Sequence, residues 1–241
     1  YADLDNDLAA ARQTGSGRHP LPDSQEFGAL LGSWGVTPET HVVAYDASGG
    51  AIAARLWWLL RWVGHEHISL LDGGYQAWQA QKLPVATDQP ALRQGDYPAR
   101  PGHMPVVYTA DVEQGLEDGS LMLLDARDAD RFDGRSEPID RLAGHIPGAR
   151  NRPFRINLDA RGRFRGEADL QESFRQMLGD ADQRLVSMCG SGVTACQNLF
   201  ALELAGVDFT DAAAPALYVG SWSEWIQSAD RPVETLLETV N

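Results

Sequence analysis

Residues 185–193, LVSMCGSGV, decide the fold class of this chain. An apolar run of strand length leads into a turn of small residues around Cys189, and an apolar segment of helical length follows over residues 194–205. A strand that passes through a tight turn into a helix begins a βαβ unit. Such units predict an α/β fold with a parallel sheet covered by helices.

The same pattern occurs once more, near the start of the chain. Residues 42–50, VVAYDASGG, again join an apolar run to a small-residue turn, and an apolar segment follows over residues 51–63. Both copies continue into a second apolar run that ends in a glycine–aromatic element, LLDGGY at 70–75 and LYVGSW at 217–222. This internal repeat predicts two similar α/β domains.

A proline-rich segment separates the two copies. Residues 84–105 contain five prolines and little apolar periodicity, which is typical of a linker. We therefore expect a first domain over residues 1–83, a linker over residues 84–105 and a second domain over residues 106–241.

Aligning the copies predicts two differences between them. Asp46 stands in the position of Cys189, so the first copy lacks the thiol. The second copy also has an earlier strand at residues 121–124, and the counterpart of that strand would lie before Tyr1. We therefore expect that the first domain lacks its opening strand in this chain.

Composition and charge exclude several classes of function. The chain has 20 Lys and Arg against 34 Asp and Glu, a net charge of −14, so we expect no nucleic-acid partner. Lys82 is its single lysine, which excludes most lysine chemistry. No apolar run reaches the roughly 18 residues that a membrane span needs, and residues 1–5 do not resemble a signal peptide. We expect a cytoplasmic protein that has no membrane contact.

Cys189 is the candidate nucleophile. It lies between a strand and a helix, where unpaired backbone N–H groups and the positive end of the helix dipole stabilise a thiolate. Gly190 and Gly192 let the amides of the loop turn inward without a Cβ clash. The alternative is a buried core cysteine, which is common for free thiols, but the strand–loop–helix placement favours a nucleophile.

Other chemistries fit the sequence less well. Cys196 lies about 10 Å along the helix from Cys189, too far for a disulfide, so we expect a core cysteine. A cysteine phosphatase would need an arginine six positions after its nucleophile, where Ala195 stands. His65 and His67 have neither the HExxH spacing nor a third ligand nearby, so we expect no metal and no other cofactor.

Four stretches together resemble the 3-mercaptopyruvate sulfurtransferases of the tandem rhodanese-like family. CGSGVTA at 189–195 is similar to the active-site loop of that family, and GHIPGA at 144–149 to its first signature. GSWSEW at 220–225 resembles the terminal signature, although Val219 stands where Asp is usual, and LLDGG at 70–74 resembles the corresponding part of the first domain. The resemblance implies two tandem domains, each a parallel β-sheet flanked by helices on both faces, with catalysis in the second domain only.

The resemblance also implies which residues hold the sulfur. Cys189 corresponds to the residue that carries it as a persulfide, and the backbone of the following loop surrounds it. The loop residues concerned are Gly190, Gly192, Val193 and Thr194.

A Ser-His-Asp set is implied beside the cysteine. Ser191 matches the serine, and His19 and Asp5, both in the first domain, match the histidine and the acid. A histidine that is held by a carboxylate and reaches a hydroxyl can polarise a carbonyl or move a thiol proton. The alternative for His19 is an exposed loop histidine.

Two arginines are implied as ligands of the donor carboxylate. Arg131 matches the first of them, and Arg141 is the best match for the second, with Arg135 as the next choice. Arg127 is expected to be structural. For each arginine the alternative is a solvated surface charge.

The neutral loop distinguishes two possible sulfur donors. Rhodaneses that use thiosulfate carry Arg and Lys after the cysteine, whereas Gly190 and Ser191 carry no charge, which favours mercaptopyruvate with its single carboxylate. The expected function is therefore sulfur transfer from 3-mercaptopyruvate, with release of pyruvate, to cyanide or to a thiol such as thioredoxin or a low-molecular-weight thiol. The alternatives are a thiosulfate:cyanide sulfurtransferase and a non-catalytic rhodanese-like binding module.

Overall fold

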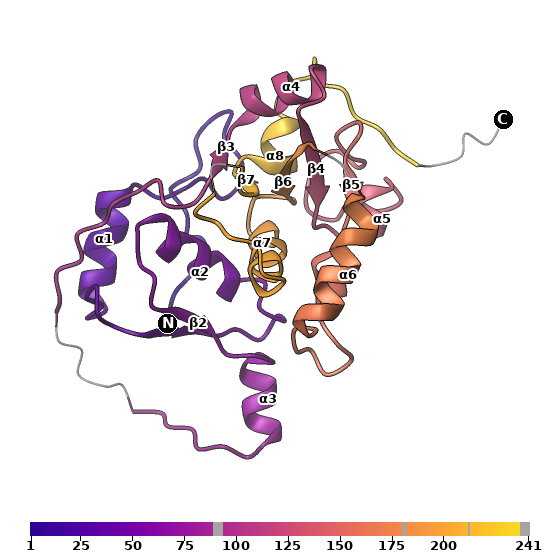
Figure 1. The fold of residues 1–241 in the computed structure, drawn as a ribbon. Coiled ribbons are helices and arrows are strands. Elements are labelled where there is room, and N and C mark those ends of the chain that lie inside the picture. The colour runs from indigo at the N-terminus through magenta and orange to yellow at the C-terminus, as the bar shows by residue number, and fades with distance from the viewer. Residues whose placement is uncertain (89–93, 180–181, 212, 237–241) are drawn as a thin grey trace.

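A computed structural model describes residues 1–88, 94–179, 182–211 and 213–236 of the chain. Within these ranges the strands are β1 (Val42–Ala44), β2 (Ile68–Leu70), β3 (Val106–Val107), β4 (Leu121–Asp125), β5 (Arg150–Asn151), β6 (Arg184–Met188) and β7 (Ala216–Tyr218). The helices are α1 (Ser24–Ser33), α2 (Ala53–Trp62), α3 (Gly74–Ala80), α4 (Thr109–Glu117), α5 (Ala129–Phe132), α6 (Glu167–Leu178), α7 (Ala195–Leu204) and α8 (Ser221–Trp225), and η1 (Phe154–Asn157) is a 3₁₀ turn. Figure 1 shows their arrangement.

The second half of the chain builds a parallel sheet of five strands in the order β3-β7-β6-β4-β5. Every residue of β4 is buried, because its side chains alternate between two apolar clusters. Met122 and Leu124 belong to one cluster, and Leu121 and Leu123 belong to the other. A strand that is covered on both faces needs a continuous apolar run, and this explains why LMLL stands at 121–124.

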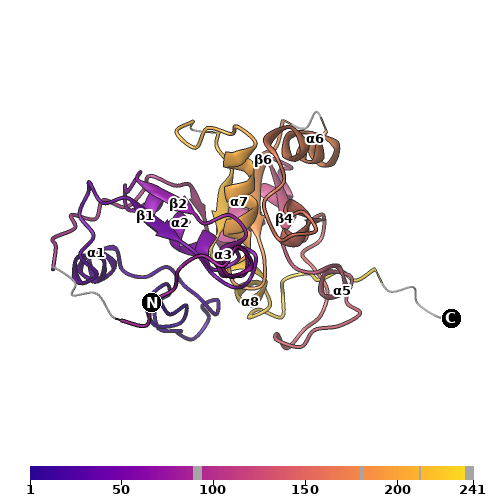
Figure 2. The same cartoon turned by 90° about the horizontal axis from the view of Figure 1, so that it is seen from below.

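Helices cover both faces of this sheet. α6 and α7 contribute Leu170 and Leu199 to the cluster on one face, and α4 and α8 contribute Val112 and Trp222 to the cluster on the other. Figure 2 shows α7 between the strands of the second half and the elements of the first half. The carboxyl end of β6 thus delivers Cys189 to a loop between the halves.

The first half holds a smaller parallel sheet, formed by β1 and β2. Val42 and Ile68 face the core on which α2 packs. Val43 faces the other way, is 53% exposed, and borders an open groove beside α3. In the second half β4 pairs with β6 on the side away from β7, and among the described residues no strand pairs with β1 at the corresponding edge. The predicted opening strand of the first domain would pair with β1 at this edge. Its absence from this chain stays a prediction.

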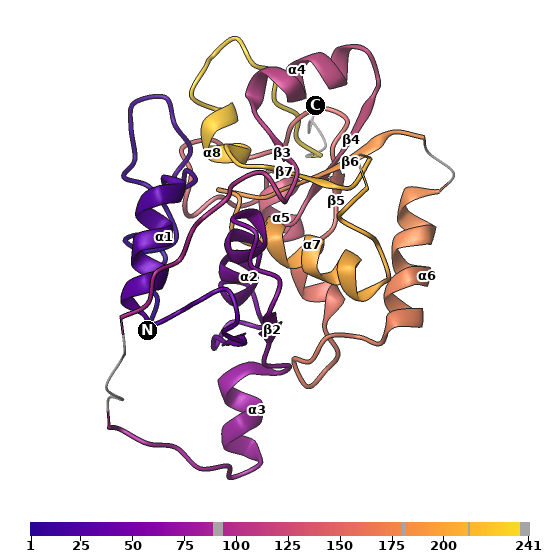
Figure 3. The same ribbon diagram turned by 60° about the vertical axis from the view of Figure 1, so that its left-hand side comes forward.

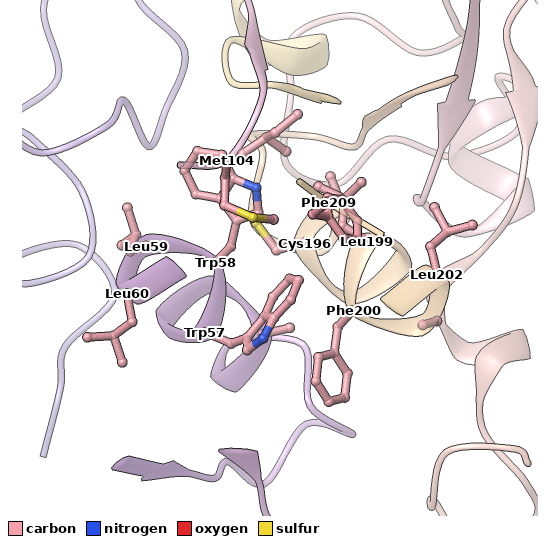
Figure 4. Close-up of a cluster of buried hydrophobic side chains, with 14 of the residues drawn as sticks. Trp57, Trp58, Leu59, Leu60, Met104, Cys196, Leu199, Phe200, Leu202 and Phe209 are labelled. Atoms are coloured by element: carbon pink, nitrogen blue, oxygen red, sulfur yellow. The ribbon is translucent and has the colours of Figure 1, made fainter. Parts of the chain in front are cut away.

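The two halves share one apolar core, in which α2 packs against α7 (Figure 3). Trp57 of α2 is fully buried, and its ring meets Phe200 edge-on with 5.2 Å between the ring centroids and Phe209 with 6.2 Å. Figure 4 shows Trp57 beside Phe200, with Met104 and Cys196 in the same cluster. Residues on both sides of the predicted linker therefore belong to the same core. The domain boundaries stay a prediction.

Two further sequence expectations concern the described residues as a whole. None of the helices in these ranges is long and apolar enough to cross a bilayer. The same ranges contain no group of three or more His, Cys, Asp or Glu side chains placed to hold a metal ion.

Replacing Trp57 by Ala tests the shared core. Removing a fully buried aromatic ring leaves a cavity, so we expect a loss of about 3–5 kcal/mol in the free energy of unfolding. Urea denaturation followed by circular dichroism measures it. Trp78→Ala in α3 is the control, because Trp78 is only partly buried and lies outside the core cluster. A loss for Trp57→Ala no larger than that for Trp78→Ala would contradict the shared core.

Candidate active site

Cys189 lies directly after β6 and is only 2% exposed. Its Sγ accepts a hydrogen bond from the backbone N–H of Ser191, over 3.4 Å. α7 begins at Ala195, so the loop of residues 190–194 lies between the strand end and the helix N-terminus, as the sequence predicts. An anionic sulfur is stabilised in such a position by backbone N–H groups and the helix dipole.

Contacts with α8 hold the carbonyl groups of this loop. The carbonyl oxygen of Cys189 accepts a hydrogen bond from the N–H of Trp222 at 3.0 Å, and that of Gly190 accepts one from the N–H of Ser223 at 2.9 Å. The N–H of Ser191 meanwhile points to the sulfur, as N–H groups do in anion-binding backbone nests. These bonds explain why the start of α8 lies against the Cys189 loop.

Ser221 is a functional residue that the sequence reasoning missed. Its hydroxyl accepts a hydrogen bond from the N–H of Cys189 at 3.1 Å and donates one to the carbonyl of Tyr218 at 2.8 Å. Its φ of +53° is uncommon for a residue other than glycine, and such backbone is held only by its surroundings. The sequence signal that could have identified Ser221 was its position between Gly220 and Trp222 in the GSWSEW motif.

Gly192 is required by its surroundings, and Gly190 lies against two arginine side chains. Gly192 has a φ of +76°, and a Cβ there would lie 2.8 Å from the carbonyl oxygen of Val219. A Cβ on Gly190 would lie 2.8 Å from Nη2 of Arg18 and 3.4 Å from Nη2 of Arg131. Two guanidinium groups therefore lie next to the loop, and one of them comes from the first half of the chain.

The predicted Ser-His-Asp set is brought together. Nδ1 of His19 lies 2.7 Å from Oγ of Ser191, and Nε2 lies 2.9 Å from Oδ1 of Asp5. A carboxylate can only accept a hydrogen bond, so Nε2 carries the proton and Nδ1 accepts the serine hydroxyl. Burial lowers the pKa of His19, although the hydrogen bond and charge of Asp5 raise it. The lowered pKa leaves His19 neutral at pH 7 and able to take a proton.

Arg131 lies in the site as predicted. It pairs with Glu137 at 2.8 Å and with Asp140 at 3.1 Å. Burial raises the pKa of Glu137, but hydrogen bonds from Arg131 and from the backbone N–H groups of Asp140 and Ile139 outweigh it and leave the pKa below its usual value. Glu137 is therefore a negatively charged partner of the arginine.

Arg18 is a second arginine of the site, and the sequence reasoning missed it. Its guanidinium pairs with Asp140, the carboxylate that also binds Arg131. The backbone N–H of Arg18 donates to Oγ of Ser223 at 3.0 Å, which ties this segment to α8. The one available signal was its position directly before His19.

The other arginines of this region lie elsewhere. Arg127 is buried and pairs with Asp125 at 2.7 Å, which agrees with a structural role. Arg135 pairs with Asp130 at the surface. Arg141 is exposed and, within the described residues, makes no hydrogen bond or ion pair through its side chain. Its role as a substrate ligand stays a prediction that these contacts do not support.

Comparisons with known proteins agree with this geometry. The family model of the rhodanese-like domain matches residues 8–81 and 109–228. The chain belongs to the rhodanese-like family. A Pseudomonas aeruginosa protein named "Probable 3-mercaptopyruvate sulfurtransferase" is 47% identical over 98% of this chain and 82% of its own length. A thiosulfate sulfurtransferase of Gallus gallus is 34% identical over 87% of this chain and 71% of its own length.

The solved structure of the Escherichia coli 3-mercaptopyruvate sulfurtransferase SseA superposes on this rhodanese-like protein with a TM-score of 0.76. The two are 31% identical, and the match covers 92% of this chain and 80% of the other. The predicted resemblance and the predicted fold class are therefore confirmed.

The first half of this rhodanese-like protein has no counterpart of the thiol, and its loop is closed by a carboxylate. Oδ1 of Asp46 accepts hydrogen bonds from the N–H groups of Ser48 and Gly50, and Oδ2 accepts them from Ile52 and Ala53, at 2.8–2.9 Å. The side chain at the aligned position thus satisfies the amides of its own loop. Four N–H groups are therefore taken by the carboxylate and are not available to a bound sulfur.

The second cysteine lies in the core, as predicted. Cys196 donates its thiol hydrogen to the carbonyl of Gly192 at 3.2 Å, and both cysteines are free. Burial raises the pKa of Cys196 to about 12, against the lowering effect of nearby Arg55. Cys196 is therefore a neutral thiol at pH 7.

Asp5→Asn tests the orientation of His19. The substitution removes the hydrogen bond and the charge that raise the pKa of His19, while burial continues to lower it. We expect the titration midpoint of His19, followed by NMR of its ring protons, to lie below 6.5 in the parent protein and lower still in the variant. The signals of the other histidines serve as the internal reference. An upward move of the His19 midpoint would contradict the pairing.

Proposed function

We propose that this protein is a 3-mercaptopyruvate sulfurtransferase, which moves the donor sulfur onto Cys189 and then to a thiol or to cyanide. One observation carries the proposal: the Cys189 loop has no charged side chain of its own and lies beside Arg18, Arg131 and the His19–Ser191 pair. The curated relatives named for this activity support it.

The charge balance of the site favours a donor with one negative charge. Arg18 and Arg131 share Asp140, and Arg131 also pairs with Glu137, so carboxylates already compensate these arginines. The single carboxylate of mercaptopyruvate binds to the remaining N–H groups of the two guanidinium groups. Thiosulfate brings two charges to the same place, close to two carboxylates, and is repelled more strongly.

In the first half-reaction the Cys189 thiolate attacks the donor sulfur. An S–S bond forms, the C–S bond breaks, and its electron pair moves into the enolate of pyruvate. The proton of the donor thiol passes through the hydroxyl of Ser191 to Nδ1 of His19, and it then returns to the enolate carbon. Pyruvate leaves, and the N–H groups of the loop hold the outer sulfur of the Cys189 persulfide.

In the second half-reaction an acceptor removes the outer sulfur. The thiolate of a protein such as thioredoxin, or of a low-molecular-weight thiol, attacks this sulfur, and Cys189 leaves as a thiolate. Cyanide reacts in the same way and gives thiocyanate. Each step returns the site to its starting charge, and none requires a metal or organic cofactor.

An assay of pyruvate release tests the proposal. With mercaptopyruvate and a thiol, the protein should release pyruvate much faster than it forms thiocyanate from thiosulfate and cyanide, and mass spectrometry should find one added sulfur on Cys189. Cys189→Ser should abolish pyruvate release, whereas Cys196→Ser should retain most of it. Faster turnover of thiosulfate would favour the alternative donor, and no turnover of either would favour a binding module.

Substitution of the arginines tests the donor site. A charge-assisted hydrogen bond to a carboxylate is worth about 1.5–3 kcal/mol, so Arg18→Ala and Arg131→Ala should each lower kcat/KM for mercaptopyruvate by roughly 10- to 100-fold. Arg175→Ala is the control, because Arg175 is exposed on α6 and pairs with Glu172. Arg141→Ala tests the sequence prediction that Arg141 is the second ligand of the donor carboxylate. If it lowers kcat/KM as much as Arg131→Ala does, the second ligand is Arg141 instead of Arg18.

A further inference from the structure

Arg55 is a buried charge that the proposed mechanism does not use. It lies on α2 in the first half of the chain, and its side chain is 0% exposed. Within the described residues it forms no ion pair with a carboxylate, and it donates to the backbone carbonyls of Leu8, Gly192 and His19. Burying an uncompensated cation is costly, so the fold retains Arg55 at the expense of stability.

The contacts of Arg55 join both parts of the active site. Its guanidinium donates to the carbonyl of His19 at 3.2 Å and to that of Gly192 at 3.4 Å. It also donates twice to the carbonyl of Leu8, at 3.3 Å, and so anchors the segment that carries Asp5. One side chain therefore holds the backbone of the histidine and the backbone of the Cys189 loop.

The Gly192 contact complements the two bonds from α8. The carbonyls of Cys189 and Gly190 are engaged by α8, and the carbonyl of Gly192 is engaged by Arg55 and by the thiol of Cys196. Loss of Arg55 would leave the Gly192 carbonyl to one weak thiol donor. The loop that receives the sulfur thus depends on a residue of the first half.

The other charged side chains of the site have partners of their own. Arg18 and Arg131 are paired with carboxylates. The Asp5 carboxylate accepts a hydrogen bond from the neutral His19 ring, and that of Asp7 accepts one from the backbone N–H of Asp3.

Two thiols remain next to the guanidinium, and they differ in charge. Cys196 is a neutral thiol at pH 7, since its pKa is about 12. Burial lowers the pKa of Arg55, against the opposing effects of Cys196 and Cys189, but an arginine starts so far above neutrality that it stays protonated. Of these two thiols, Cys189 is the one that the proposed reaction uses as an anion.

We propose that Arg55 is a positioning residue of the sulfur-transfer site, whose charge is balanced by the thiolate and the persulfide anion of Cys189. It holds the Gly192 carbonyl and the His19 backbone so that Ser191 and His19 meet beside the sulfur. The persulfide part of this inference rests on the proposed function, whereas the thiolate part does not.

Alkylation of Cys189 tests the charge. The rate of iodoacetamide reaction, followed by mass spectrometry of the Cys189 peptide across pH, reports the thiolate. In Arg55→Met the alkylation rate at pH 7 should fall roughly tenfold, because the thiolate loses a neighbouring positive charge. Arg55→Lys keeps the charge and should restore most of the difference. Arg61→Met is the matched control on the same helix, where Arg61 is 26% exposed and 3.9 Å from Glu203, and it should leave the profile unchanged.

Turnover tests the positioning. Arg55→Lys cannot reach all of its carbonyl partners, so kcat for pyruvate release should fall at least tenfold with KM little changed, because Arg55 does not touch the donor. In a Ser191→Ala background, Arg55→Lys should lower kcat by a smaller factor than it does in the parent protein. Such non-additivity is expected when two residues act through one contact. Full additivity, or a rise confined to KM, would overturn the positioning role.

The outcomes separate the two proposals. An unchanged alkylation profile in Arg55→Met, or an equal shift in Arg61→Met, would overturn the charge role whether or not mercaptopyruvate is the donor. No pyruvate release by the parent protein would remove the proposed function and leave the alkylation result standing. If Arg55→Met does not fold, Arg55→Gln replaces it, and a profile equal to that of the parent would again overturn the proposal.

Discussion

The contact between α2 and α7 is the constraint on which the site depends. α7 begins directly after the Cys189 loop, and α2 carries Arg55 to the same place. Because Trp57 locks these helices together in one dry core, the first half can supply His19 to a loop that belongs to the second half. A protein whose halves unfolded independently would lose this arrangement without changing any residue of the loop.

The two copies of the repeat show how one backbone pattern serves two purposes. In both, a strand ends in a small-residue turn whose N–H groups need an acceptor. Asp46 meets that need with its own carboxylate, which reaches four amides and closes the first loop. The side chain of Cys189 is shorter, and its Sγ accepts a hydrogen bond from the N–H of Ser191. The aligned residue therefore decides which copy can react.

Local charge, rather than net charge, sets the chemistry of the site. The chain carries −14 overall, yet the Cys189 loop lies among Arg18, Arg131 and Arg55. Asp140 and Glu137 compensate the first two, and the proposed donor accordingly carries a single carboxylate. Of the three, Arg55 forms no ion pair with a carboxylate within the described residues, and it contacts the loop at the Gly192 carbonyl. In the two proposals, the paired arginines Arg18 and Arg131 bind the donor. Arg55, which has no carboxylate partner among the described residues, stabilises the sulfur anion.

The sequence by itself determined the α/β class, the two copies, the Cys189 loop and the Ser191, His19 and Asp5 set, because local spacing and glycine positions specify a strand, a turn and a helix, and because the motifs resemble a known family. The tertiary structure alone decided that Arg18 lies in the site, that Arg141 points to solvent, and that Ser221 and Arg55 support the loop. These contacts join residues far apart in the chain, as Arg18 and Asp140 are, and no periodicity encodes them. The direction of a side chain in an irregular loop is set by what packs around it, and only the folded chain supplies those neighbours.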